Sequence, residues 1–168
     1  KMKLVARSNL IPKASKGAGM TSQHNEAGQS CPVARTADVI GDRWSLLIVR
    51  DAFDGVRRFG DFQSGLGVAR SVLTNRLKNL VEAGIFEVRP ASDGTSYQEY
   101  VLTEKGKSLF PVVVAFRQWA EQYLFEPHEA RSQLVDTATG QPLGLMQPVT
   151  AQGQAIAPEQ TRVKKNPA

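Results

Sequence analysis

The sequence predicts a mainly α-helical domain that carries one small β-hairpin, an α+β fold. Between residues 32 and 83, apolar side chains recur at steps of three and four residues, which is the period of amphipathic helices. After Gly84 the pattern changes to the two-residue alternation of strands, and a second helical stretch runs from residue 103 to about residue 124.

Length and composition narrow the class of protein. A chain of 168 residues suffices for one domain with extensions. Because no apolar run is long enough to cross a membrane and no secretory signal pattern is present, we expect a cytoplasmic protein. The single cysteine excludes an internal disulfide, and His24 and His128 are far apart, so we expect no metal and no cofactor.

The formal net charge of +5 is distributed unevenly along the chain. Residues 1–30 contribute most of it, which is weak evidence for a nucleic-acid partner. Residues 55–80 are more informative, because their only acid is Asp61 and their cations are Arg57, Arg58, Arg70, Arg76 and Lys78. A local basic patch on an otherwise nearly neutral domain favours an anionic partner such as nucleic acid.

Composition also predicts three regions. Residues 1–29 should be a disordered leader; Met20 fits a native start, in which case residues 1–19 would be foreign to the native protein. Residues 30–125 should form the folded domain. Residues 126–168 form an extension with a weak internal repeat at 137–143 and 150–156. There we expect short strands or hairpins near 133–149, followed by a flexible tail.

The first two predicted helices supply much of the core. Pro32 fits the first position of a helix that ends before Gly41. Asp42 should cap the next helix, residues 43–53, whose apolar residues occur almost all round, as in a buried central helix.

The following segments predict a helix-turn-helix. A short helix at residues 59–65 is followed by a glycine-containing turn and a helix at residues 70–83. This second helix has an apolar back and a front of cationic, amide and hydroxyl groups, which suits the major groove of DNA. We predict contacts with base edges from Ser71, Thr74, Asn75 and Lys78. The alternative is an ordinary amphipathic helix whose polar face contacts only water.

A β-hairpin directly after a helix-turn-helix is a wing. Its predicted strands are residues 86–89 and 97–102, and the turn-rich residues 90–96 join them. We predict contacts with DNA phosphates from Arg57, Arg58, Arg70 and Arg89. Arg76 can point to the DNA backbone or to an acid of its own domain. For the wing, the alternative is a hairpin that contacts nothing.

Residues 103–124 predict a longer helix with a broad aromatic stripe, capped by Thr103 and bent or restarted at Pro111. Because helix-turn-helix proteins commonly bind two-fold symmetric sites, we expect the stripe to form part of a homodimer interface. An effector pocket between this helix, helix 43–53 and the partner subunit would use four aromatic residues, unless they simply pack in the core: Trp44, Phe53, Phe116 and Trp119.

Several stretches, in order, resemble the HxlR-type transcriptional regulators. They are CPVA at 31–34, IGDRWSLLIVR at 40–50, RFGDF at 58–62, LTNRLKNL at 73–80, GI at 84–85 and YVLTEKG at 100–106. The resemblance covers about residues 31–125. It implies a winged helix related to the MarR regulators, a homodimer formed through terminal helices, and bacterial transcriptional control that often responds to electrophiles, oxidants or metabolites. One departure is the arginine before Trp44, where the family often has lysine.

Cys31 is the one candidate for reaction chemistry. At a helix N-terminus, the helix dipole favours the thiolate form of a cysteine. The position of Cys31 matches a cysteine that serves as a redox switch in some members of the family. The resemblance therefore implies that modification of Cys31 alters the spacing of the two recognition helices. The alternative is a capping residue without a sensing role.

The sequence thus predicts a DNA-binding transcriptional regulator, specifically a dimeric repressor of a pseudo-palindromic operator in double-stranded DNA, with a possible small-molecule effector. The alternative function is a winged-helix module that docks proteins without sequence-specific DNA binding. We predict no enzymatic activity, because the sequence has neither a phosphate-binding glycine loop nor a nucleophile with a matching base.

Overall fold

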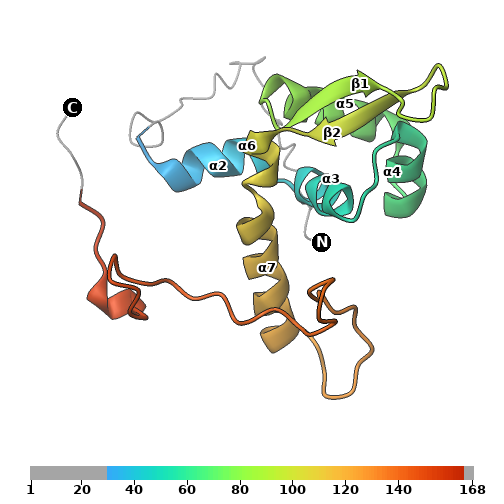
Figure 1. Cartoon of the computed structure of the whole chain (residues 1–168). Coiled ribbons are helices and arrows are strands. Elements are labelled where there is room, and N and C mark those ends of the chain that lie inside the picture. The colour runs from blue at the N-terminus through green and yellow to red at the C-terminus, as the bar shows by residue number, and fades with distance from the viewer. Residues whose placement is uncertain (1–29, 165–168) are drawn as a thin grey trace, which may run out of the picture. The chain divides into compact units, whose positions relative to one another are not determined.

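The computed structural model describes residues 30–164, which form the elements labelled in Figure 1. Of these residues, 36–164 belong to one compact unit and 30–35 to another. The predicted leader, with its suggested start at Met20, lies outside the described residues, as do residues 165–168 of the predicted tail. The domain boundaries expected at residues 30 and 126 stay a prediction.

The first helices form where the sequence predicts them. Helix α2 spans Pro32–Ile40 and helix α3 spans Arg43–Phe53. Asp42 is the N-cap of α3, since its Oδ1 accepts hydrogen bonds from the backbone N–H groups of Trp44 and Ser45 at 3.0 and 3.1 Å. Helix α3 packs against α4 (Phe59–Leu66), α5 (Arg70–Glu82) and α7 (Phe110–Tyr123), as expected of a central helix.

The predicted hairpin follows α5 directly. Strand β1 (Phe86–Pro90) pairs antiparallel with β2 (Gln98–Leu102), with Val88 opposite Tyr100. The two strands lie beside α5, which contacts β1 (Figure 1). Relative to the prediction, β1 is one residue longer at its end and β2 begins one residue later.

One hydrophobic core joins α3, α4, α5 and β1. Its buried residues are Ile40, Ile48, Val49, Phe62, Val68, Leu73, Leu77, Leu80, Ile85 and Phe86. The rings of Phe62 and Phe86 meet edge to face with centroids 6.4 Å apart, so α4 and the wing share the same core. This packing fixes the helix-turn-helix and the wing to each other.

The predicted long helix after the wing is two helices. Helix α6 covers only Glu104–Lys107, and α7 starts at Phe110 with Pro111 in its first turn. A proline is tolerated there, because the first N–H groups of a helix have no intrahelical partner, whereas in a helix interior it clashes with the preceding turn. Of the two outcomes predicted for Pro111, the structure shows the restart.

One tight turn lies within residues 133–149, where short strands or hairpins are expected, and a second tight turn follows it. Each turn is closed by a single β-bridge, Val135 with Pro142 and Val149 with Ala155, and each contains a glycine at positive φ. The first bridge is flanked by two backbone hydrogen bonds: the N–H of Asp136 donates to the carbonyl oxygen of Gln141 at 2.9 Å, and the N–H of Leu143 donates to that of Leu134 at 3.4 Å. The two copies of the internal repeat therefore fall at these two turns, which differ in length by one residue. A short 3₁₀ helix, η1 (Pro158–Gln160), follows them.

Gln118 of α7 holds the extension against the helix. Its Nε2 donates to the carbonyl oxygen of Gly144 at 2.9 Å, and its Oε1 accepts from the N–H of Met146 at 2.8 Å. Both ends of one amide are thus used to satisfy the backbone of a segment without regular structure.

Candidate nucleic-acid interface

The turn between α4 and α5 sets the direction of the second helix. Gly67 ends α4 in the left-handed region, with φ at 60°, and the extended Ala69 precedes the first turn of α5. Glycine adopts the left-handed conformation without a steric penalty from Cβ, which is why it ends so many helices. Leu73, Leu77 and Leu80 then bury one side of α5 in the core. The opposite side faces outward.

All four residues predicted to contact base edges lie on the exposed side of α5. Ser71, Thr74, Asn75 and Lys78 are each exposed. The Nζ of Lys78 lies 3.7 Å from a carboxylate oxygen of Glu82 one turn further on, an exposed pair of the kind that contributes little to stability. The structure therefore brings these four side chains together on one accessible helix face.

Arg70 and Arg76 of the same helix point in different directions. The Arg70 guanidinium lies over the ring of Phe59, 5.0 Å from its centroid, at the entry to α5. Arg76 turns back to Asp42, with Nε 3.2 Å from Oδ1. Of the two directions predicted for Arg76, the structure shows the one toward an acid of its own domain.

Asp42 links α5 to the start of α3. Burial alone would raise the pKa of Asp42, but hydrogen bonds from Ser45 and Trp44, together with the charge of Arg76, hold that pKa below its usual value. Asp42 is thus a capping residue of α3 and the partner of Arg76 in α5.

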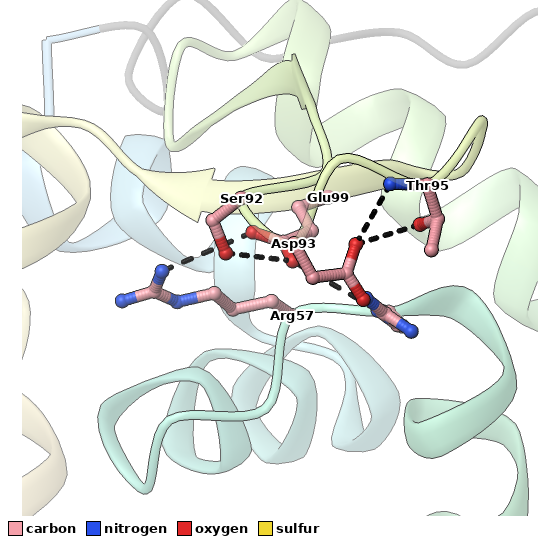
Figure 2. Close-up of polar contacts among 6 residues, drawn as sticks. Arg57, Ser92, Asp93, Thr95 and Glu99 are labelled. Atoms are coloured by element: carbon pink, nitrogen blue, oxygen red, sulfur yellow. Dashed lines mark hydrogen bonds and ion pairs between the residues drawn. The ribbon is translucent and has the colours of Figure 1, made fainter.

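Arg57 and Arg58 contact two acids of the wing, Glu99 and Asp93. Figure 2 labels Arg57 and the two acids. Nη1 of Arg57 and Nε of Arg58 each lie 3.8 Å from a carboxylate oxygen of Glu99 in β2. Arg58 also forms an ion pair and a hydrogen bond with Asp93 in the wing loop. The hydrogen bond to Asp93 is the main reason why the pKa of Arg58 is raised.

Asp93 is also bonded within the wing loop. Its Oδ1 accepts from the N–H of Thr95 at 3.1 Å and from the Thr95 hydroxyl at 2.7 Å. The bonds from Thr95 and Arg58 lower the pKa of Asp93 to about 2. This carboxyl group therefore carries a negative charge throughout the physiological pH range.

Arg89, the fourth predicted phosphate contact, lies in β1 and pairs with Glu87 two residues earlier. The sequence reasoning missed Glu87, Asp93 and Glu99 as partners of the predicted arginines. Charge and alternation along the strands single out Glu87, which lies on the same face as Arg89. No sequence signal singles out Asp93 or Glu99, which are 35 and more residues away from the arginines that they contact.

The four aromatic residues predicted to line an effector pocket have different neighbours. The Trp44 ring lies under the Arg43 guanidinium, and Phe53 packs edge to face on Phe110 with centroids 5.2 Å apart. Phe116 and Trp119 are exposed on α7.

One cavity does lie between α3 and α7. It has a volume of about 320 Å³, and its lining includes Leu47, Val113, Phe116 and Phe125 among apolar residues and Arg50, Arg117 and Arg131 among charged ones. Of the four predicted aromatic residues, only Phe116 contributes to its wall.

Residues 30–164 are the part of the chain that the structure describes. That part of the chain contains no group of three or more histidine, cysteine or acidic residues placed to hold a metal ion. Within the same residues, no helix has both the length and the apolar character needed to cross a membrane.

The fold and the exposed α5 define a winged helix-turn-helix protein. The model of a family described as HxlR-like helix-turn-helix matches residues 39–128, more than half of the chain. This chain therefore belongs to the HxlR-like helix-turn-helix family.

Two mycobacterial proteins are similar to this chain. The uncharacterized HTH-type transcriptional regulators Mb3122 of Mycobacterium bovis and Rv3095 of Mycobacterium tuberculosis are each 45% identical to this chain over 104 residues. The match covers 62% of this chain and 65% of each relative, slightly less than two thirds of their length.

Solved structures share the fold. PA1607, a proposed transcription factor, matches with a TM-score of 0.77 and 52% identity, over 82% of this chain and 96% of its own. HypR, described as a redox regulator and solved in reduced form, matches with a TM-score of 0.50 and 32% identity, over 55% of this chain and 92% of its own. The oxidized form of HypR matches with the same TM-score.

Proposed function

We propose that this protein is a transcriptional regulator, a dimeric repressor that places the exposed face of α5 in the major groove of double-stranded DNA. The observation that carries the proposal is the division of α5 into two sides. Leu73, Leu77 and Leu80 are buried, while the face that carries Asn75 and Lys78 is accessible along the helix. A helix displayed in this way fits the major groove, where amide, hydroxyl and cationic groups read base edges.

The arginines next to this face supply the contacts with phosphate. Arg57, Arg70 and Arg89 are exposed, and Arg58 is half-buried. The ion pairs of Arg58 with Asp93 and of Arg89 with Glu87 can be exchanged for phosphate oxygens, since exposed pairs contribute little to stability. These contacts set the position of α5 in the groove, and the contacts with base edges set the sequence preference.

Salt dependence of duplex binding tests the proposal. Binding that neutralises phosphates releases counterions, so the logarithm of the binding constant should fall with the logarithm of salt concentration with a slope of about −0.9 per phosphate contact. Fluorescence anisotropy of a labelled duplex, titrated at several salt concentrations, measures this slope. A protein-docking module would show no such dependence, and a wild-type protein that binds no duplex would contradict the proposal.

The exposed aromatic residues of α7 support the homodimer. Phe116, Trp119 and Tyr123 are 58%, 56% and 62% exposed, and the rings of Trp119 and Tyr123 touch at a centroid distance of 5.7 Å. Large apolar side chains grouped in this way favour an interaction with another surface. A two-fold dimer through α7 would present two α5 helices to half-sites about 34–36 Å apart.

Replacing Trp119 with glutamate is expected to shift the protein from dimer to monomer. The substitution removes the aromatic contact from the two-fold interface. It also brings the new carboxylate close to the same carboxylate of the other subunit, and the two negative charges repel each other. Light scattering after size-exclusion chromatography measures the mass in solution. Val163→Glu is the matched control, because Val163 is an apolar residue outside α7 with 90% exposure. A Trp119→Glu protein that stays dimeric would contradict the role of this face.

We also propose that Cys31 senses oxidants or electrophiles. Cys31 is half-buried directly before α2, and its carbonyl oxygen accepts the N–H of Arg35 at 3.1 Å, so it occupies the N-terminal end of the helix. The similarity to HypR, which is described in reduced and oxidized forms, supports this role. Since Cys31 is the single cysteine, a disulfide must join two copies of the chain or a small thiol.

Cys31→Ser should make DNA binding insensitive to diamide. Diamide oxidises thiols, and this variant contains none, so the bound fraction should stay constant while the wild-type protein dissociates. An electrophoretic mobility shift with and without diamide measures the difference. Serine keeps the capping capacity of this position, so the fold is preserved. Equal release of both proteins from DNA would rule out Cys31 as the sensor.

A small-molecule effector would bind in the cavity between α3 and α7. Its volume of about 320 Å³ is at the lower end of the range for ligand sites, about 300–1,000 Å³. Because α7 also carries the proposed dimer face, a ligand there can alter the separation of the two α5 helices.

A further inference from the structure

Two of the four arginines assigned to phosphate contacts lie next to one carboxylate, that of Glu99. Arg57 and Arg58 each lie 3.8 Å from a different oxygen of this carboxylate. Figure 2 shows the ion pair between Arg57 and Glu99. Arg89 is the residue directly opposite Glu99 in the hairpin register. These arginines come from two segments distant in sequence, the loop before α4 and the first strand of the wing.

The placement of Glu99 is unusual for a glutamate, because the residue is only 6% exposed. Burial of a carboxylate is unfavourable unless charges and hydrogen bonds compensate for it. Here the compensation comes from the two guanidinium groups and from the Ser92 hydroxyl, which donates at 3.3 Å. Glu99 therefore has a fixed position, and it restricts the arginines that neutralise it.

The main chain next to Glu99 is fixed to the same loop. The N–H of Tyr100 donates to the carbonyl oxygen of Arg57 at 2.8 Å, so the loop before α4 runs along the outer edge of β2. A long side chain that is ordered before binding loses less conformational entropy when it contacts a phosphate. The arrangement thus orders the side chains of Arg57 and Arg58 for contact with phosphate.

Asp93 has a different relation to the same arginines. Asp93 is exposed at the tip of the wing and pairs directly with the Arg58 guanidinium. The bidentate geometry of guanidinium suits carboxylate and phosphate oxygens alike. The Asp93 carboxylate therefore occupies a place on Arg58 that a DNA phosphate would need.

We propose that the two acids act in opposite directions on DNA binding: Glu99 is a positioning residue for Arg57 and Arg58, and Asp93 competes with phosphate for Arg58. This inference rests on the proposed function. The wing then contains an exposed anion, Asp93, that limits affinity for DNA, and a buried anion, Glu99, that positions the arginines for phosphate.

Two neutral variants separate these roles, because Asp93→Asn and Glu99→Gln each remove one negative charge. If only net charge mattered, both variants would bind DNA more tightly. We expect Asp93→Asn to bind about three- to tenfold more tightly, with a salt slope steeper by about 0.9. We expect Glu99→Gln to bind about tenfold more weakly in spite of its lower negative charge, because the two arginines lose their fixed position.

The probe is a labelled random-sequence duplex, and the readout is anisotropy at several salt concentrations. Glu104→Gln is the charge-matched control, since Glu104 is exposed in α6 and pairs with Lys107, away from the wing arginines. We expect little change for this control. Relaxation of the arginine Nε–Hε groups by NMR without DNA supplies a second readout: Arg58 should become more mobile in Glu99→Gln.

Each other outcome has a defined consequence. Tighter binding by both variants, or no change in either, would overturn the inference and leave the proposed function intact. A wild-type protein that binds no duplex would overturn both. If Glu99→Gln fails to fold, Ser92→Ala removes one hydrogen bond to Glu99 without a change in charge. That variant should bind DNA more weakly than wild type, and unchanged affinity in it would refute the positioning role.

Discussion

Replacing Gly106 with alanine should lower the free energy of unfolding by about 3 kcal/mol, a large share of the roughly 5–15 kcal/mol that stabilises a typical native protein. A Cβ at Gly106 would lie 2.2 Å from the carbonyl oxygen of Ile85 and 2.9 Å from Cδ2 of Leu102. The Ile85 oxygen accepts the N–H of Thr103 at 3.0 Å, so it cannot move away without breaking a hydrogen bond. Chemical denaturation followed by circular dichroism measures the loss.

Gly60→Ala is the matched control for this prediction. Gly60 lies in α4, is exposed, and has no atom within 4 Å of the position of an added Cβ. Alanine there should stabilise the protein by about 0.5–1 kcal/mol, since it reduces the backbone freedom of the unfolded chain. Equal changes in stability for the two variants would contradict the close approach of α6 to the end of α5 and the start of β1.

Asn75→Asp is expected to reduce affinity for the operator about a hundredfold. The change removes the amide N–H donor that can pair with a base, an interaction of about 1–3 kcal/mol. It also places a negative charge next to the phosphates, which repel it. Asn75 is exposed and makes no contact that supports the core, so the stability of the fold should not change. Genome-wide mapping of bound sites identifies the operator, and anisotropy at fixed salt measures the affinity.

Two controls locate the effect of this variant on α5. Asn79→Asp makes the same chemical change one turn closer to the C-terminal end of the helix, where we expect a smaller loss of affinity. Arg70→Ala removes a phosphate contact, so it should weaken binding to all sequences and reduce the salt slope by about 0.9. If Asn75→Asp and Arg70→Ala both left operator affinity intact, the proposed reading face would be the wrong one.

Most of the secondary structure follows from local sequence signals. The helical period and the Asp42 cap predict α3, and the glycine turn between Phe62 and Leu73 predicts the helix-turn-helix. The change of period after Gly84 predicts the hairpin. These signals act between residues that are close in the chain, where propensities and capping decide the conformation. The sequence did not decide whether the helix predicted at residues 103–124 bends or restarts at Pro111, because a proline inside a helical pattern permits either.

Local sequence signals do not predict contacts between segments that are distant in the chain. The sequence identifies Arg57 and Arg58 as cations beside a helix-turn-helix, but it contains no signal that pairs them with Glu99 or Asp93. Likewise, a helical stripe does not reveal whether Trp119 faces a core or remains exposed. Such outcomes depend on how many neighbouring elements cover each face, which is a property of the assembled chain.

By itself, the sequence determined the order of helices and strands, the helix-turn-helix with its wing, and the polar face of α5, because each of these depends on the spacing of residues within one segment. Only the tertiary structure decided that Arg76 turns inward to Asp42, that Gly106 has no room for a side chain, and that two acids of the wing hold the arginines of the loop before α4. The physical reason is that packing brings together groups that are far apart along the chain, and the energy of a buried charge or a close contact depends on what surrounds it.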